Sequence, residues 1–224
     1  MRKNTLFISC FLLGVLAAGA QTTAAPEKSD PEARKILDRV RKKYDGYKTL
    51  EATFTLTIEV TAQPKEVQNG SVGQQGNKFR LDMDQQIIVS DGKTTWVYLK
   101  KNNEIQINDT DPNDANGFLT PKDLLRRYEK GDYLFAVTDK IAEKGRVLTQ
   151  IEFKPKDKNS EYFKIRVSID EKAGTIESIK AFAKDGSRYT FQVTRLSPNK
   201  TFNSSYFQLD PAKYPGVHVE DLRM

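Results

Sequence analysis

The strongest pattern in the chain is an alternation of apolar and polar side chains that begins at Leu50. Over residues 50–61 threonine and glutamate alternate with five apolar side chains: Ala52, Phe54, Leu56, Ile58 and Val60. A period of two places alternate side chains on opposite faces of a β-strand. Similar short segments recur at 67–74, 78–84, 86–90, 94–100, 104–108, 133–142, 147–154, 162–170, 175–183, 188–196 and 206–209. Short turns such as Asp91-Gly92 separate many of them, so the pattern predicts an antiparallel meander of about eleven strands rather than alternating strands and helices.

Two segments have helical spacing instead. Asp30-Pro31-Glu32 combines an N-cap residue, a proline at the first helical position and an acidic first turn, and Asp45-Gly46 is a suitable end. Between them the apolar residues fall on one face: Ala33, Ile36, Leu37, Val40 and Tyr44. A second, shorter helix is predicted from Thr120-Pro121 to Gly131.

The first twenty residues predict a cleaved signal peptide. Arg2 and Lys3 precede an apolar run at 6–16, and Ala18-Gly19-Ala20 is a small-x-small cleavage pattern, with cleavage expected after Ala20. Residues 21–29 are interpreted as a flexible leader and 30–224 as a single domain. Cys10 lies within the apolar run rather than after it, which disfavours lipidation and leaves the mature chain without cysteine. A secreted, soluble mature protein is expected.

Charge and composition argue against several classes of function. The chain has 36 basic and 30 acidic residues that are interspersed, whereas a nucleic-acid-binding protein usually clusters its basic residues. His218 is the only histidine, which disfavours a Ser-His-Asp triad and a zinc site. Asp109, Asp111 and Asn113 begin like a calcium loop, but Asp114 and Thr120 stand where that loop needs glycine and glutamate. We therefore predict no catalytic residue, no metal and no cofactor, although spacing alone leaves a paired-carboxylate glycosidase open.

Three segments carry a family resemblance. They are Thr49-Leu50-x-Ala52-x-Phe54, then 88–98 with Asp91-Gly92-Lys93 followed by Trp96 and Tyr98, and finally Phe207-x-Leu209 with Tyr214-Pro215-Gly216-Val217. Over roughly residues 32–223 the chain resembles the LolA family of periplasmic lipoprotein carriers. The resemblance implies a mainly β (α+β) fold, an open, curved antiparallel half-barrel whose concave face is covered by helices. It also implies a non-enzymatic, monomeric carrier that accepts lipoprotein acyl chains from an inner-membrane transporter and delivers them to an outer-membrane acceptor.

The resemblance also suggests site residues. Lys78-Phe79-Arg80-Leu81 matches the family strand whose phenylalanine handles cargo, although a core position for Phe79 is equally compatible with the sequence. The candidate cavity-lining residues are Phe54, Leu56, Ile58, Phe79, Leu81, Val89, Trp96 and Tyr98. Alternation alone does not decide which sheet face is concave. Where well-studied members carry an arginine that closes the lid, this chain has Gln74-Gln75-Gly76, so Gln75 is either a weaker lid contact or no such latch operates.

Two other functions stay open at this stage. The same half-barrel serves lipid- or lipoprotein-sensing modules that regulate another protein, and a secreted hydrolase with an unrecognised site is the third possibility. The sequence identifies neither the cargo nor the docking surface for membrane partners.

Overall fold

A computed structural model describes residues 28–110, 121–143 and 145–223. The helices are α1 (Pro31–Asp45), α2 (Pro121–Lys130) and a short 3-10 turn, η1 (Pro211–Lys213). The strands are β1 (Thr49–Glu59), β2 (Glu66–Gln75), β3 (Lys78–Met83), β4 (Gln86–Ser90), β5 (Thr94–Leu99), β6 (Glu104–Asp109), β7 (Tyr133–Glu143), β8 (Arg146–Pro155), β9 (Tyr162–Asp170), β10 (Thr175–Ala183), β11 (Arg188–Pro198) and β12 (His218–Asp221). The predicted signal peptide, leader residues 21–27 and the 111–113 part of the calcium-like segment lie outside the described residues.

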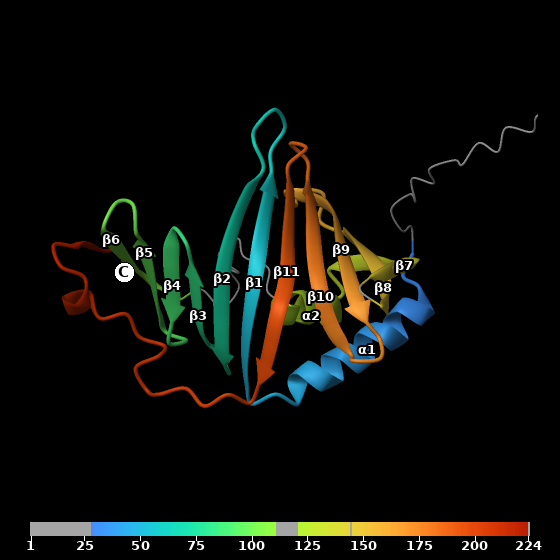
Figure 1. The fold of residues 1–224 in the computed structure, drawn as a ribbon, viewed down its shortest axis with the longest axis horizontal. Helices are drawn as coiled ribbons and strands as arrows, with labels where there is room; N and C mark the ends of the chain where they lie inside the picture. The colour runs from blue at the N-terminus through green and yellow to red at the C-terminus, as the bar shows by residue number, and fades with distance from the viewer. Residues whose placement is uncertain (1–27, 111–120, 144, 224) are drawn as a thin grey trace, which may run out of the picture.

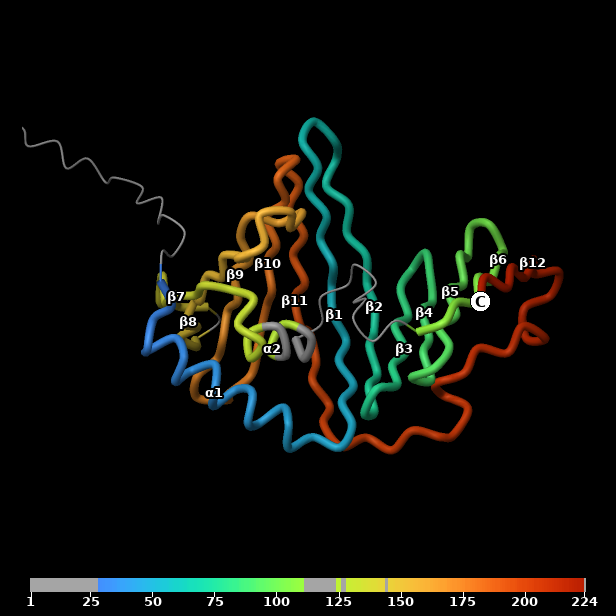
Figure 2. The backbone as a smooth tube through the Cα atoms, turned by 180° about the vertical axis from the view of Figure 1, so that it is seen from behind, coloured from blue at the N-terminus to red at the C-terminus, as the bar shows by residue number. Residues whose placement is uncertain are grey.

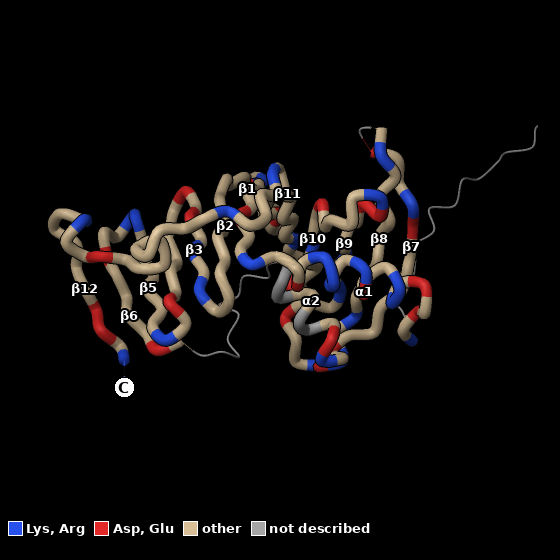
Figure 3. Tube along the Cα trace, turned by 90° about the horizontal axis from the view of Figure 1, so that it is seen from below, with Lys and Arg blue, Asp and Glu red and all other residues tan. Residues whose placement is uncertain are grey.

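All twelve strands form one sheet, in the order β12-β6-β5-β4-β3-β2-β1-β11-β10-β9-β8-β7 (Figure 1). Every neighbouring pair is antiparallel except β12 and β6, which run parallel. Near the middle of the sheet β1 pairs with β11, so an early strand and a late strand of the chain lie side by side. The sheet is open and curved, as Figure 3 shows from below, which confirms the predicted half-barrel.

One predicted strand is wrong and one was missed. Residues 206–209 form a turn followed by irregular chain rather than a strand, because Phe207 and Leu209 bury their side chains against the sheet without joining its ladder. The twelfth strand, β12, escaped prediction because its side chains are all exposed and show no alternation. Its position comes from pairing with β6, from His218 opposite Glu104 to Asp221 opposite Ile107.

Helix α1 begins and ends as its sequence predicts. The Asp30 carboxylate accepts a hydrogen bond from the Glu32 backbone N–H at 2.8 Å, and Gly46 donates back to the Lys42 carbonyl. The predicted apolar stripe of α1 is buried. It packs, together with Leu124, Leu125 and Tyr128 of α2, into the main core cluster, and the Tyr128 hydroxyl donates to Asp38 at 3.0 Å.

The two helices cover only part of the concave face. Figure 2 shows both of them on one side of the sheet, and Figure 3 shows them beneath β7–β10 and not beneath β3–β6. Their sheet partners in the core include Phe135, Ile151, Phe153, Val167 and Ile169 from β7, β8 and β9. The helices thus pack against strands of the second half of the chain, and the same cluster continues into β1–β4 through residues such as Phe54 and Leu81.

The opposite, convex face of the first half is covered by a C-terminal strap, residues 202–217. Ile87, Val89, Ile105 and Ile107 form a second cluster with Leu209 of the strap, against which Trp96, Tyr98, Tyr214 and Val217 pack. The Tyr206 ring lies so close to Gly73 that a Cβ there would be 2.7 Å from it. Only glycine at this position lets the strap approach β2.

Candidate functional site

A cavity of about 560 Å³ opens on the concave face beside the helices. Ligand pockets commonly measure roughly 300–1,000 Å³, so the volume suits a small or elongated ligand. Its described lining residues come from strands β1–β5 and β9–β11 and from the turns between them, and none of these residues belongs to α1 or α2. Among the described residues, the wall of the cavity is therefore formed by the sheet and its turns.

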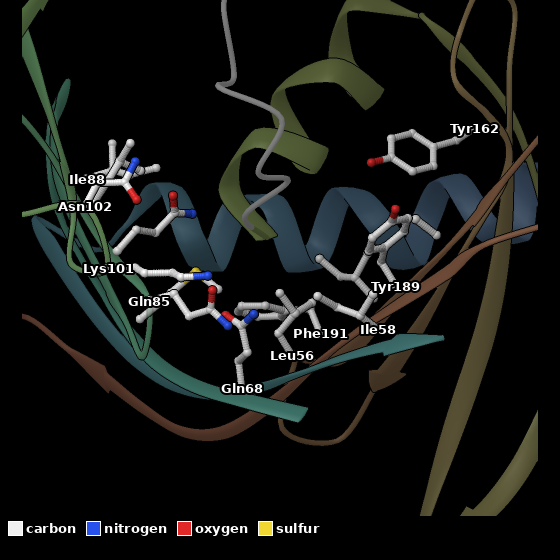
Figure 4. A pocket seen from close by; sticks show the side chains of 15 residues that line it. Leu56, Ile58, Gln68, Gln85, Ile88, Lys101, Asn102, Tyr162, Tyr189 and Phe191 are labelled. Atoms are coloured by element: carbon white, nitrogen blue, oxygen red, sulfur yellow. The ribbon is translucent and has the colours of Figure 1, made fainter. Parts of the chain in front are cut away.

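The apolar part of the lining spans the centre of the sheet. Its aliphatic and aromatic residues are Leu56, Ile58, Met83, Ile88, Leu99, Ile179, Ala181 and Phe191 (Figure 4). Exposure increases along β1: Ala52 and Phe54 are each 2% exposed, whereas Leu56 and Ile58 are half-buried. The concave surface of β1 is therefore more exposed toward the hairpin that joins β1 to β2.

A polar rim bounds one side of the cavity. It consists of Gln68, Gln85, Gln86, Lys101 and Asn102, and Figure 4 shows its labelled members on the opposite side from the two tyrosines. The Glu66 carboxylate accepts hydrogen bonds from the Gln68 and Gln85 amides at 2.7 and 3.2 Å. Lys101 is the one formally charged group among the described lining residues. The rim can donate and accept hydrogen bonds while adding little net charge.

Two tyrosines close the other side. The rings of Tyr162 and Tyr189 meet edge to face, with centroids 6.2 Å apart. Burial is the main cause that raises the pKa of the Tyr162 hydroxyl, so this phenol is neutral at physiological pH. The tyrosine side of the cavity thus presents two aromatic rings and the uncharged hydroxyl of Tyr162.

The structure places the predicted lining residues in three different environments. Leu56 and Ile58 line the cavity. Phe54 and Leu81 are buried in the main core, and Phe79 is partly buried against it. The Phe54 ring lies 4.4 Å from that of Phe191 (centroid to centroid), and so connects this core with the cavity wall.

The other predicted residues lie elsewhere. Val89, Trp96 and Tyr98 face the convex side and pack in the cluster under the C-terminal strap, away from the cavity. Their neighbour Ile88 points the opposite way and lines the cavity, as the strand period requires. Gln75 is exposed at the end of β2, opposite Thr49 and therefore far along the strand from Ile58. A lid contact for Gln75 stays a prediction.

Sequence reasoning missed the β9–β11 wall and the polar rim. Phe191 and Tyr189 stand directly opposite Leu56 and Ile58 in the β1–β11 pairing, which joins positions more than a hundred residues apart in the chain. The alternation of apolar and polar residues around Tyr189 and Phe191 predicted a strand, but it did not predict that β1 is the neighbour of that strand. The rim glutamines and Asn102 occupy strand ends and turns, where polar residues are ordinary and carry no signal of a site.

The described residues contain no group of three or more metal-ligating side chains. His218 is exposed on β12, at the edge of the sheet farthest from β7. In the part of the chain that the structure covers, no helix combines the length and apolar character needed to cross a bilayer.

The fold and the cavity define a class of protein: an open, curved β-sheet with helices on its concave face and an apolar cavity beside them. The family model described as "Outer membrane lipoprotein carrier protein LolA" matches residues 45–210. The chain belongs to the LolA family.

Individual relatives agree with this assignment. The chain is 29% identical to an outer-membrane lipoprotein carrier protein of Edwardsiella ictaluri, over 99% of this chain and 98% of that one. It is 28% identical to the protein of the same name from Erwinia tasmaniensis, over 97% and 98%. A shorter match, 31% identical, covers 46% of this chain but only 29% of an uncharacterized protein of Methanocaldococcus jannaschii.

A solved structure shares the fold. The crystal structure of an uncharacterized conserved protein from Thermus thermophilus matches with a TM-score of 0.56 at 12% identity, over 86% of this chain and 99% of that one.

Proposed function

We propose that this protein is a non-enzymatic periplasmic carrier that holds the acyl chains of lipoproteins in its concave cavity and transfers them from the inner to the outer membrane. The observation that carries the proposal is the cavity of about 560 Å³ next to the helices of a LolA-family chain. A transporter at the inner membrane and an acceptor at the outer membrane are the partners that such a cycle requires.

An acyl chain that crosses an aqueous compartment without a carrier pays a large free-energy cost. Each methylene group moved from a membrane into water costs about 0.8 kcal/mol, so an acyl chain of about fifteen methylenes costs about 12 kcal/mol. The half-buried Leu56 and Ile58 and the buried Phe191 offer an apolar surface that offsets this cost. Because the same contacts oppose release, delivery requires a tighter acceptor or an input of energy elsewhere.

The polar rim suits the end of a lipid where hydrocarbon gives way to ester and amide groups. Carbonyl oxygens of that region accept hydrogen bonds from the amides of Gln68, Gln85 and Gln86, and these side chains can also accept from an amide N–H. The acyl chains would then extend from the rim toward Ile179 and Phe191.

Uptake of a fluorescent long-chain fatty acid by the purified protein tests the proposal. Ala181→Trp places a large ring in the cavity and should abolish uptake, whereas Ala142→Trp, at an exposed position of β7, is the matched control and should retain it. Because the indole could disturb the core, Ile58→Lys provides a second test at a half-buried lining position, with Val67→Lys on exposed β2 surface as its control.

Native mass spectrometry of protein purified from a membrane-containing lysate adds a second measurement. Bound lipid or lipoprotein is expected in the wild type and its loss in Ile58→Lys. Protein that is always empty, together with equal uptake by all four variants, would exclude the carrier function.

A further inference from the structure

The convex face behind the tyrosine side of the cavity carries an exposed aromatic residue in an unusual backbone position. The β9–β10 pairing shifts register between Phe182 and Ala183, whose partners are Lys164 and Tyr162. Phe163 is therefore left without a partner at a β-bulge. Its ring is 50% exposed and lies 6.1 Å from that of Phe182 on the neighbouring strand. A bulge redirects a side chain, and here it turns a phenylalanine toward solvent.

Four basic side chains surround the Phe182 ring. Their charged groups lie at 4.7 Å (Lys164), 5.7 Å (Arg166), 5.7 Å (Lys180) and 5.9 Å (Arg188) from the ring centroid. Cations within about 6 Å of an aromatic ring are attracted to its face. We call Phe163, Phe182 and these four residues the basic patch.

Acidic residues neutralise only part of this charge. Glu152 is fully buried beneath the patch and pairs with Lys164 at 3.1 Å and Arg166 at 2.6 Å. Glu59 pairs with Lys180 at 3.3 Å. Within the described part of the chain, Arg188 makes no ion pair. Four basic groups against two acids leave the patch positively charged, and the guanidinium of Arg188 is exposed.

The basic patch lies at the same end of the sheet as the tyrosine side of the cavity. Tyr162 and Tyr189 line the cavity, and their chain neighbours Phe163 and Arg188 belong to the patch on the other face. Arg188 stands opposite Glu59 in the β1–β11 pairing, next to the pair formed by Ile58 and Tyr189. A surface that held the patch would therefore lie directly across the sheet from the tyrosine side of the cavity.

We propose that the basic patch is a docking site for an anionic phospholipid bilayer. A convex sheet surface cannot enclose a small ligand, but its most protruding side chains can contact an extended surface. Exposed aromatic and apolar side chains enter the interfacial layer of a membrane, and surrounding lysines and arginines attract anionic headgroups. Docking there brings the tyrosine side of the cavity close to the membrane, whether or not the cavity holds cargo.

Co-sedimentation with vesicles tests the proposal on the full-length mature protein. Binding is expected to phosphatidylcholine vesicles that contain phosphatidylglycerol and not to phosphatidylcholine alone. It should disappear at about 1 M salt, where the Debye length is about 3 Å. Arg188→Gln should weaken binding about fivefold, the usual effect of one basic residue near an anionic surface. Phe163→Ala should weaken it by a similar factor.

Two matched variants serve as controls. Lys35→Gln removes an exposed lysine from α1 on the other face, and Leu222→Ala removes a 48% exposed side chain just beyond β12 at the far edge of the sheet. Both should bind as the wild type does, and all four variants should unfold at the wild-type temperature because the substituted side chains are exposed.

Equal binding to neutral vesicles, no binding to anionic vesicles, or equal losses in patch and control variants would each overturn the proposal. If vesicles do not bind and the patch variants instead weaken association with an acidic protein, the patch is a protein interface. Failure of the fatty-acid uptake test alone would exclude the carrier function but leave vesicle binding intact, so the two proposals can fail separately.

Discussion

The two halves of the concave face use the same kind of strand for different purposes. Beneath β7–β9 the inward side chains, such as Ile151 and Phe153, are fully buried by α1 and α2. On β1 the inward side chains Leu56 and Ile58 are only half-buried and border the cavity. Strand alternation provides an apolar face in both places, and the position of the helices decides whether that face becomes core or binding site.

The largest expected effect is on the stability of the helix-covered half. Phe153→Ala removes a fully buried ring and should lower the free energy of unfolding by about 3–5 kcal/mol. Leu56→Ala, in the cavity, should cost about 1 kcal/mol because that side chain is already partly in water. Urea denaturation of both variants checks the difference. Equal losses would mean that the cavity wall is packed as tightly as the core.

A glycine at the boundary between the halves provides the next test. A Cβ at Gly70 would lie 2.5 Å from the Phe54 ring and 2.9 Å from the Asp82 carbonyl oxygen. Gly70→Ala should therefore destabilise the protein by about 1–3 kcal/mol, as overpacking does. Because Phe54 contacts Phe191 of the cavity wall, fatty-acid affinity should fall as well. Thermal unfolding and a binding titration measure the two effects, and unchanged stability would show that the strands separate enough to admit the methyl group.

Alkaline pH should lower the free energy of unfolding through a tyrosine in the helix-covered half. Burial raises the pKa of Tyr44 to about 12, and its hydroxyl accepts a hydrogen bond from the Ile176 N–H at 3.2 Å. The raised pKa means that the neutral form is favoured in the folded state. Its contribution to stability is complete below pH 10, the ordinary tyrosine pKa, and is lost as pH rises toward 12.

Tyr44→Phe isolates this contribution. The variant lacks the ionisable hydroxyl, so the stability difference between wild type and variant should shift in favour of the variant by about 2 kcal/mol between pH 10 and pH 12. Chemical denaturation across that range measures it. A difference that is independent of pH would contradict the assignment to Tyr44.

The smallest effect is expected at the polar rim. Gln68→Met removes the hydrogen bond to Glu66, but Glu66 is exposed and Gln68 is only half-buried, so stability should change by less than about 0.5 kcal/mol. Affinity for a plain hydrocarbon probe should be retained, while affinity for a diacylated lipopeptide should fall. Loss of both affinities would show that Gln68 shapes the cavity rather than contacting a polar group of the ligand.

Local chemistry was sufficient to predict the elements whose ends are determined by their own residues. Asp30 and Pro31 start α1, and the alternation of Phe54, Leu56 and Ile58 defines β1, as predicted. The lining of the cavity was harder to predict because it depends on which strands become neighbours. Trp96 and Tyr98 alternate as clearly as the β1 residues, yet the strap covers them on the convex face. Which face receives helices and which receives the strap is determined by contacts across more than a hundred residues.

The position of β11 beside β1 has a consequence for how the chain matures. Until residues near 190 have emerged, β1 lacks one of its two neighbours, and the future ligand surface of Leu56 and Ile58 stays open to solvent. Pairing between such distant segments is slow because a long loop must close before any contact forms. The newly synthesised polypeptide should therefore pass through an interval in which the apolar face of β1 is exposed and prone to aggregation. A chaperone that binds β1 in that interval would raise the yield of folded protein.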